Sequence, residues 1–268
     1  MDIANIIDMQ RYPSPHPRID VFLVTYLSDG YRVKGFLAVP KWKANSQDGK
    51  FPGFLYLRGG IKGVGMVRIG RIIQFASEGF IVMAPFYRGN CGGEGYEDFA
   101  GEDRQDALQA FEIVREHPLV NEGNIHVFGF SRGGAMALLT GIEQPAVKSI
   151  VTWGGVSDMA LTYEERVDLR RMMKRVIGGT PRKVREQYKR RTPLEQIEKI
   201  NAPVLIIHGA QDKNVSVNHA YLLAEKLKEH NKQYTSWIFE EYTHYFPPQV
   251  NRKVVHDVTH WMKNSYLI

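Results

Sequence analysis

The 268-residue sequence predicts an α/β fold in which a mostly parallel sheet of about eight strands is flanked by helices. Short apolar, β-rich segments alternate with longer segments of helical pattern, which is typical of a parallel sheet covered on both faces. The run Ser28-Asp-Gly-Tyr31 between two N-terminal apolar segments is a strong hairpin signal. Hydrophobic residues make up 43% of the chain, enough for one large core.

Taken in order, an extended segment with Pro13, Pro15 and Pro17 precedes the two hairpin strands. The expected strands lie near residues 21–27, 32–39, 53–57, 80–84, 125–130, 147–153, 203–207 and 235–240, and the last two helices near 217–231 and 249–263. Residues 157–200 break the alternation with two or three helices. We expect residues 1–268 to form a single domain, with 157–200 as a helical cap over one edge of the sheet.

The most informative motif surrounds Ser131. Residues 125–130 read as a buried strand that ends in Gly129-Phe-Ser131-Arg-Gly133, and an alanine- and leucine-rich helix follows at once. A strand that turns so sharply into a helix exposes the middle hydroxyl, and only small neighbours permit the turn. The alternative, a glycine-rich turn with an ordinary serine, is less consistent with this context. Ser131 is therefore the candidate nucleophile.

A serine nucleophile needs a base that is oriented by an acid, and in this architecture both follow it in the chain, acid first. Asp212 leaves the end of the strand at 203–207 and is the candidate acid, although such a residue can also serve as a turn or helix cap. Asp158, after the preceding strand, is the reserve candidate. Of the five histidines beyond Asp212, only His244 lies in a loop between a strand and a helix, so it is the candidate base.

An oxyanion hole requires two N–H donors aimed at one point. We expect the Arg132 amide, directly after Ser131, and the Gly60 amide, in the glycine-rich loop after the strand at 53–57. Arg58 in the same loop could bind a substrate carboxylate, or it could pair with a Glu or Asp beneath the loop. Tyr87 and Trp153, near strand ends, are further candidates for the substrate pocket, or they are core residues.

These motifs resemble the catalytic domain of the prolyl oligopeptidase family, which has the α/β-hydrolase fold and includes acylaminoacyl peptidases and related esterases. The resemblance runs from about residue 20 to the C-terminus and rests on Arg58-Gly-Gly, Tyr87-Arg-Gly-Asn, Gly-Phe-Ser131-Arg-Gly-Gly, His-Gly-Ala-Gln-Asp212 and Thr-His244-Tyr-Phe. The chain also closely resembles bacterial members of this family that are described as uncharacterised peptidases. Two departures are Arg58, where relatives commonly have His or Tyr, and the lack of the family's propeller domain.

Composition excludes several other classes. The net charge is +6, and residues 164–199 hold 12 Lys or Arg against 6 Asp or Glu, which favours a solvated helical face over an acidic partner. No nucleic-acid motif, metal-ligand spacing or dinucleotide-binding glycine pattern is found, so we expect no cofactor, no metal and no nucleic-acid partner. No secretory signal or membrane-length apolar segment is seen, and Cys91 stands alone, which predicts a cytoplasmic protein without membrane association.

The sequence thus predicts a serine hydrolase that cleaves ester or amide bonds through an acyl-enzyme. Its substrate is expected to be a small ester or a short peptide, and a homo-oligomer is compatible with the sequence. The peptidase would be favoured by a carboxylate pair able to bind an amino terminus; Glu94, Glu97 and Asp98 are the suggestive cluster, although the favoured interpretation is that they cap or flank the next helix. The alternative from another class is a catalytically silent binding or scaffold protein.

Overall fold

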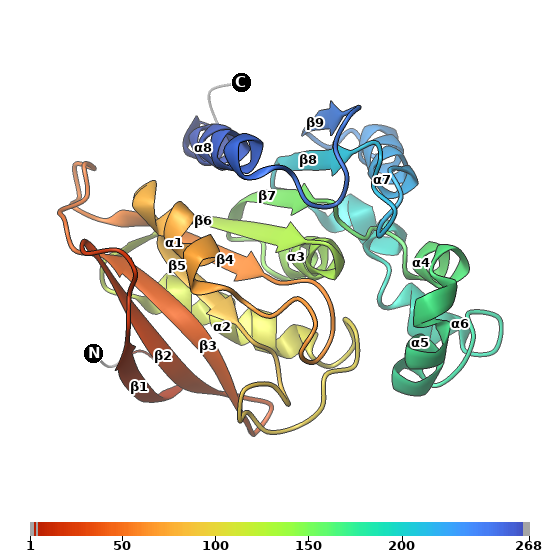
Figure 1. Ribbon diagram of the computed structural model, residues 1–268, viewed down its shortest axis with the longest axis horizontal. Coiled ribbons are helices and arrows are strands. Elements are labelled where there is room, and N and C mark those ends of the chain that lie inside the picture. Colours follow the sequence, from red (N-terminus) through yellow and green to blue (C-terminus); the bar gives the residue numbers. More distant parts are fainter. Residues whose placement is uncertain (1–2, 4, 265–268) are drawn as a thin grey trace.

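A computed structural model describes residue 3 and residues 5–264. Its sheet has nine strands in the order β1-β2-β3-β5-β4-β6-β7-β8-β9 (Figure 1). The strands are β1 (Ile6–Tyr12), β2 (Ile19–Ser28), β3 (Tyr31–Pro40), β4 (Phe51–Leu57), β5 (Ile81–Pro85), β6 (Val120–Phe130), β7 (Val147–Trp153), β8 (Val204–Gly209) and β9 (Tyr234–Phe239). From β5 to β9 all neighbours are parallel, whereas β1, β2 and β3 extend the sheet with antiparallel pairing.

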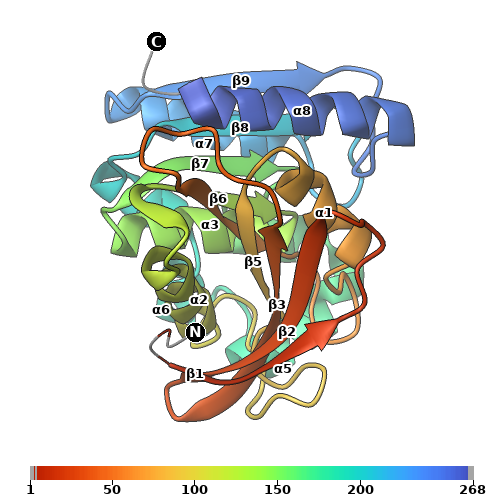
Figure 2. The same ribbon diagram turned by 90° about the vertical axis from the view of Figure 1, so that its left-hand side faces the viewer.

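Helices cover both faces of this sheet, as the alternation predicts. They are α1 (Ile69–Ser77), α2 (Arg104–Glu116), α3 (Arg132–Glu143), α4 (Met159–Glu165), α5 (Arg170–Ile177), α6 (Arg185–Lys189), α7 (Asn218–Glu229) and α8 (Pro248–Asn264), with short 3-10 helices at Val167–Leu169 and Pro193–Lys199. One core cluster joins the sheet to α2, α3 and α7, and a second joins it to α1 and α8. Figure 2 shows α8 in front of β8 and β9, with its axis nearly along these strands.

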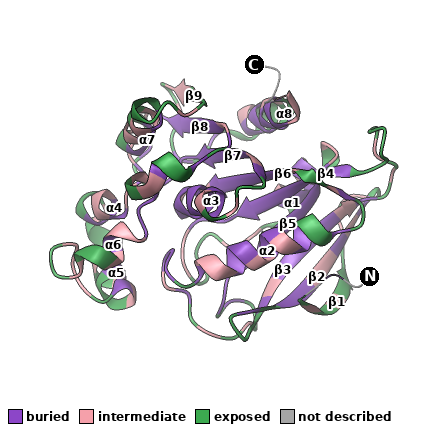
Figure 3. Ribbon diagram, turned by 180° about the vertical axis from the view of Figure 1, so that it is seen from behind, coloured by how far each residue is buried: buried purple, intermediate pink, exposed green. Residues whose placement is uncertain are grey.

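The central strands are almost fully buried (Figure 3). Strands covered on both faces read as continuous apolar runs, so they were the easiest elements to predict. All eight predicted strands are present with bounds within two residues, except that β6 begins earlier, at Val120. The hairpin between β2 and β3 also forms, because Asp29 and Gly30 both adopt positive φ, as its two-residue turn requires.

The sequence did not predict β1. This strand pairs with β2 at the edge of the sheet, and most of its side chains are exposed. An edge strand exposed on both faces has no apolar alternation to reveal it. The proline segment expected at the start of the sheet instead follows β1.

The insertion between β7 and β8 contains α4, α5, α6 and both 3-10 helices, which gather to one side of the sheet (Figure 1). Several of its basic side chains form ion pairs, including Arg166 with Asp168, and Arg191 with Asp98 of the main body. Within residue 3 and residues 5–264, no helix combines the length and apolar character that crossing a membrane requires.

Candidate active site

Ser131 occupies the turn between β6 and α3, as the motif predicts. Its backbone has φ 58° and ψ −125°, a conformation that L-residues rarely adopt. The turn is tightly packed: a Cβ on Gly129 would overlap with the carbonyl of Gly133, and a Cβ on Gly133 would overlap with the carbonyl of Leu57. The two flanking glycines are therefore required by space, and the local sequence accounts for the strained serine.

His244 and Asp212 come together from the loops after β9 and β8. The Nδ1 atom of His244 lies 2.6 Å from Oδ2 of Asp212, and both residues are buried. The other carboxylate oxygen accepts hydrogen bonds from the backbone N–H groups of Asn214 and Val215. These bonds hold the carboxylate so that it accepts a hydrogen bond from Nδ1–H, which leaves Nε2 of His244 as the basic atom.

A second histidine, which the sequence did not single out as a candidate, lies beside this pair. Nε2 of His208 is 3.5 Å from Oδ2 of Asp212 and 2.9 Å from the carbonyl oxygen of Val215. Burial lowers the pKa of His208, so its ring is neutral at physiological pH and donates to that carbonyl. Its position at the end of a buried strand, four residues before Asp212, was the available signal.

Ser131 and His244 line one cavity of about 260 Å³. Gly60 and Arg132, the two predicted oxyanion-hole residues, line it as well. The rest of its wall is largely apolar. It comes from the loops after β4 and β8, from Phe99 and Phe130, from the segment after β7 that includes the insertion, and from the loop around Tyr245. A larger cavity of about 710 Å³ lies at the opposite edge of the sheet, among residues such as Trp42, Phe51 and Lys263.

The residues predicted for the substrate pocket need correction, since Arg58, Tyr87 and Trp153 are each at most 1% exposed. None of the three is found among the described residues that line the cavity. Arg58 instead forms a buried ion pair with Glu97, which was the alternative interpretation. The Tyr87 ring packs against the guanidinium groups of Arg58 and Arg132, and Trp153 packs against Phe246 in the core.

The insertion supplies pocket residues that the sequence did not single out. Thr162, Arg166, Leu169 and Met172 all line the cavity. The four positions span α4, the first 3-10 helix and α5, with spacings of four, three and three residues. The chain is not helical at Arg166, so these side chains do not share the face of one helix, and no local pattern identifies them.

The alternative acid and the acidic cluster have structural explanations. Asp158 caps α4 by accepting hydrogen bonds from the backbone N–H groups of Ala160 and Leu161, so it is not the partner of His244. Asp98 accepts from the backbone N–H groups of Glu102 and Asp103, just before α2. Glu94 accepts from the backbone of Arg32, and Glu97 is paired with arginines, so the cluster does not form a carboxylate pair in the cavity.

With this geometry described, the chain can be compared with known proteins. Residues 67–266 match the pattern of the prolyl oligopeptidase family. Over 260 residues the chain is 60% identical to the uncharacterized peptidase YtmA of Bacillus subtilis (strain 168), and the match covers 97% of this chain and 99% of that relative.

Two solved structures illustrate the likeness in fold. The acylaminoacyl peptidase of Pyrococcus horikoshii superposes with a TM-score of 0.76 at 20% identity, over 97% of this chain and 42% of its own. Acetyl xylan esterase 1 of a Thermoanaerobacterium species superposes with a TM-score of 0.72 at 14% identity, over 96% of this chain and 89% of its own. The chain therefore belongs to the prolyl oligopeptidase family of serine hydrolases, and it has the α/β-hydrolase fold that the sequence predicts.

Proposed function

We propose that Ser131, His244 and Asp212 form the catalytic triad of a hydrolase that cleaves ester or amide bonds in small substrates. The observation that carries this proposal is the strained Ser131 sharing one cavity with His244, whose Nδ1 bonds to Asp212. His244 takes the Ser131 proton as the hydroxyl oxygen attacks the carbonyl carbon. His244 then protonates the leaving group, and water repeats the two steps on the acyl-enzyme.

The Gly60 and Arg132 amides are the proposed oxyanion donors. Both residues line the cavity, and Arg132 begins the helix that follows Ser131, so its N–H has no partner one turn earlier within that helix. Gly60 adopts φ +66°, and a Cβ there would overlap with the carbonyl of Val64. This position therefore requires glycine, which permits the tight loop that carries the proposed Gly60 donor beside the cavity.

Residues 157–200 act as a cap in this proposal, since four of their side chains line the cavity beside Ser131. A cavity of about 260 Å³ with a mostly apolar wall suits a small or medium acyl group or one apolar side chain. The relatives include both proteins named as peptidases and an esterase, so the substrate class is a small ester or a short peptide. A cytoplasmic location and a homo-oligomer stay predictions.

The decisive experiment compares wild type with Ser131→Ala on two panels, p-nitrophenyl acyl esters of rising chain length and aminoacyl p-nitroanilides. We expect the variant to lose turnover by at least about 10³-fold. Serine-dependent turnover of the esters alone would identify an esterase, and serine-dependent cleavage of the anilides a peptidase. Activity that survives the substitution would contradict the triad, and activity on neither panel would favour the silent binding protein.

A further inference from the structure

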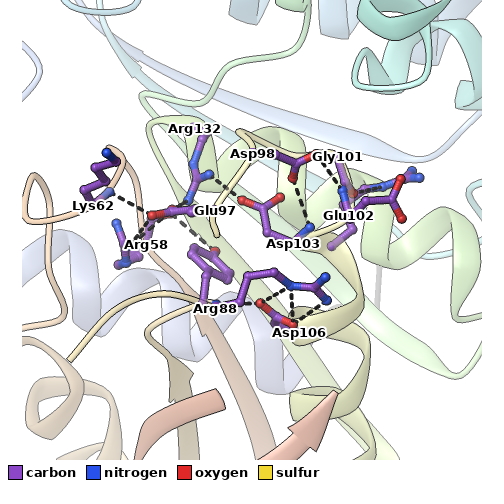
Figure 4. A network of polar contacts seen from close by, with 12 residues as sticks. Arg58, Lys62, Arg88, Glu97, Asp98, Gly101, Glu102, Asp103, Asp106 and Arg132 are labelled. Carbon is purple, nitrogen blue, oxygen red and sulfur yellow. Dashed lines mark hydrogen bonds and ion pairs between the residues drawn. The ribbon is translucent and has the colours of Figure 1, made fainter. Parts of the chain in front are cut away.

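One buried carboxylate joins the two segments that carry the proposed oxyanion donors (Figure 4). The Glu97 side chain is 1% exposed, and both of its oxygens accept from Nη2 of Arg58, at 3.1 and 3.0 Å. It also accepts from the backbone N–H of Lys62 at 2.7 Å and from the side-chain amide of Asn90 at 2.9 Å. On its other side Glu97 pairs with Nη2 of Arg132.

The partners of Glu97 come from both segments that carry the proposed oxyanion donors. Arg58 and Lys62 bracket Gly60 in the loop after β4, whereas Arg132 is the residue whose own backbone N–H is the second donor. Arg58 also donates to the carbonyl oxygens of Gly59 and Val64, at 2.9 and 3.2 Å, and so holds the loop at two further points. A shift of Glu97 would therefore move the two donor segments relative to each other.

Glu97 supplies the negative charge that balances the buried arginines of this cluster. The side chains of Arg58 and Arg132 are both 1% exposed, and two unscreened guanidinium groups in one buried site repel each other. Burial alone would raise the pKa of Glu97, but Arg132 and Arg58 outweigh burial and hold the pKa below its ordinary value, so Glu97 is charged. Asp103 is the other acid on Arg132, and burial raises the pKa of Asp103 to about 7 despite that contact. Below neutral pH, Glu97 is therefore the main counter-charge for both arginines.

We propose that Glu97 is a positioning residue for the oxyanion hole: it sets the distance between the Gly60 and Arg132 amides by binding both donor segments at once. This inference rests on the proposed function. Glu97 is absent from the described residues that line the cavity, so it acts through its partners and does not touch the substrate. Oxyanion stabilisation requires donors held within a fraction of an ångström, which is the task this cluster performs.

The test variant is Glu97→Gln, which keeps the size of the side chain and removes its charge. Its kcat on the best p-nitrophenyl ester should fall about 10- to 100-fold while KM changes little, because the donors matter most in the transition state. Glu102→Gln is the matched control, since Glu102 lies in the same segment but its side chain is 64% exposed and pairs with Arg190. This control should keep the wild-type kcat.

A second readout separates positioning from general damage to the fold. A trifluoromethyl ketone forms a tetrahedral oxyanion adduct with the serine, whereas the corresponding alcohol cannot. We expect Glu97→Gln to weaken binding of the ketone by about the same factor by which it lowers kcat/KM, and to leave the affinity for the alcohol unchanged. Equal loss for both compounds, or no loss for the ketone, would overturn the proposal.

Glu97→Asp decides the question if the Gln variant does not fold. It keeps the charge but is one methylene shorter, so it cannot reach both arginines in the same geometry. A folded Asp variant should show the same selective loss of the ketone, and wild-type values would contradict the inference. Ser131→Ala tests the proposed function separately. Activity that survives this substitution would contradict the triad. Serine-dependent activity that Glu97→Gln leaves unchanged would contradict only the role of Glu97.

Discussion

The distance of 2.6 Å between His244 Nδ1 and Asp212 Oδ2 determines which nitrogen of the imidazole carries its proton. A carboxylate with two backbone donors on its other oxygen is an acceptor for Nδ1–H, so Nε2 is the free nitrogen, which in the proposed mechanism takes the proton of Ser131. The orientation of one side chain thus determines whether the base can act.

Replacing Asp212 with Asn should therefore reverse the tautomer of His244. The amide NH₂ can donate to Nδ1, which would place the proton on Nε2 and block the base. We expect kcat on a p-nitrophenyl ester to fall by about 10³- to 10⁴-fold with little change in KM. Steady-state kinetics at neutral pH measures both values.

The same substitution at Asp158 is the control. Asp158 caps α4, and Asn is an equally good N-cap, so Asp158→Asn should keep kcat within about twofold and leave stability unchanged. If Asp158→Asn lost activity as strongly as Asp212→Asn, the assignment of the acid would be wrong.

At the residue scale, the sequence shows the order and placement of candidate groups but not the direction of each side chain. Ser131, Asp212 and His244 could be chosen because each follows a strand at the same edge of the sheet. Arg58 and Trp153 also lie at strand ends, yet they are buried away from the cavity. The direction of Arg58 depends on Glu97, 39 residues later, and such a distant pair leaves no local pattern.

At the scale of elements, the cavity wall from α4 to α5 is the part that should distinguish substrates. Leu169 and Met172 present half-buried apolar side chains to the cavity, one from the 3-10 helix and one from α5. Their contact with an acyl chain would be hydrophobic and hence proportional to the area covered.

Met172→Trp should shorten the preferred acyl chain. The larger side chain fills part of the cavity, so kcat/KM for p-nitrophenyl octanoate should fall about 10-fold or more relative to p-nitrophenyl acetate. Kinetics across the ester series measures this ratio. Arg171→Ala, at the exposed neighbouring position, should leave the chain-length profile unchanged. An unchanged profile in Met172→Trp would show that the insertion does not contact the acyl group.

Elements differ in how well the sequence predicts them. The buried strands can be predicted because they are short, nearly continuous apolar runs, and the helices around them because their apolar residues recur with a helical period. Strand β1 was missed because it is an exposed edge, and its pairing depends on β2 rather than on its own apolar pattern. The insertion was recognised as helical, but which of its faces meets the cavity depends on tertiary packing.

At the scale of the whole molecule, buried neutral histidines make stability depend on pH. Burial lowers the pKa of His126 to about 3 and the pKa values of His117 and His219 to about 4, from an ordinary 6.5. Below pH 6.5 the unfolded chain binds protons that the folded chain does not. The stability that these residues contribute is therefore present above pH 6.5 and is lost as the pH falls toward 4 and below.

His126→Gln should reduce this acid sensitivity. Between pH 7 and pH 5, a histidine with the pKa of His126 accounts for a loss of about 2 kcal/mol in the free energy of unfolding. The loss in free energy of unfolding between these two pH values should therefore be smaller in the variant than in wild type, by about that amount. Urea unfolding at both pH values measures it. His230→Gln, at an exposed position after α7, is the control and should lose as much as wild type. Equal losses in His126→Gln and wild type would contradict the prediction.

The insertion has a further consequence because it is continuous in sequence. The proposed reacting groups come from loops spread along the sheet, whereas one wall of the cavity comes from α4, the 3-10 helix and α5 in a single stretch of chain. This wall of the cavity and the proposed reacting groups are thus encoded in separate parts of the gene. In the proposed function, changes confined to this one contiguous segment would alter substrate preference while the proposed triad and donors stay as they are.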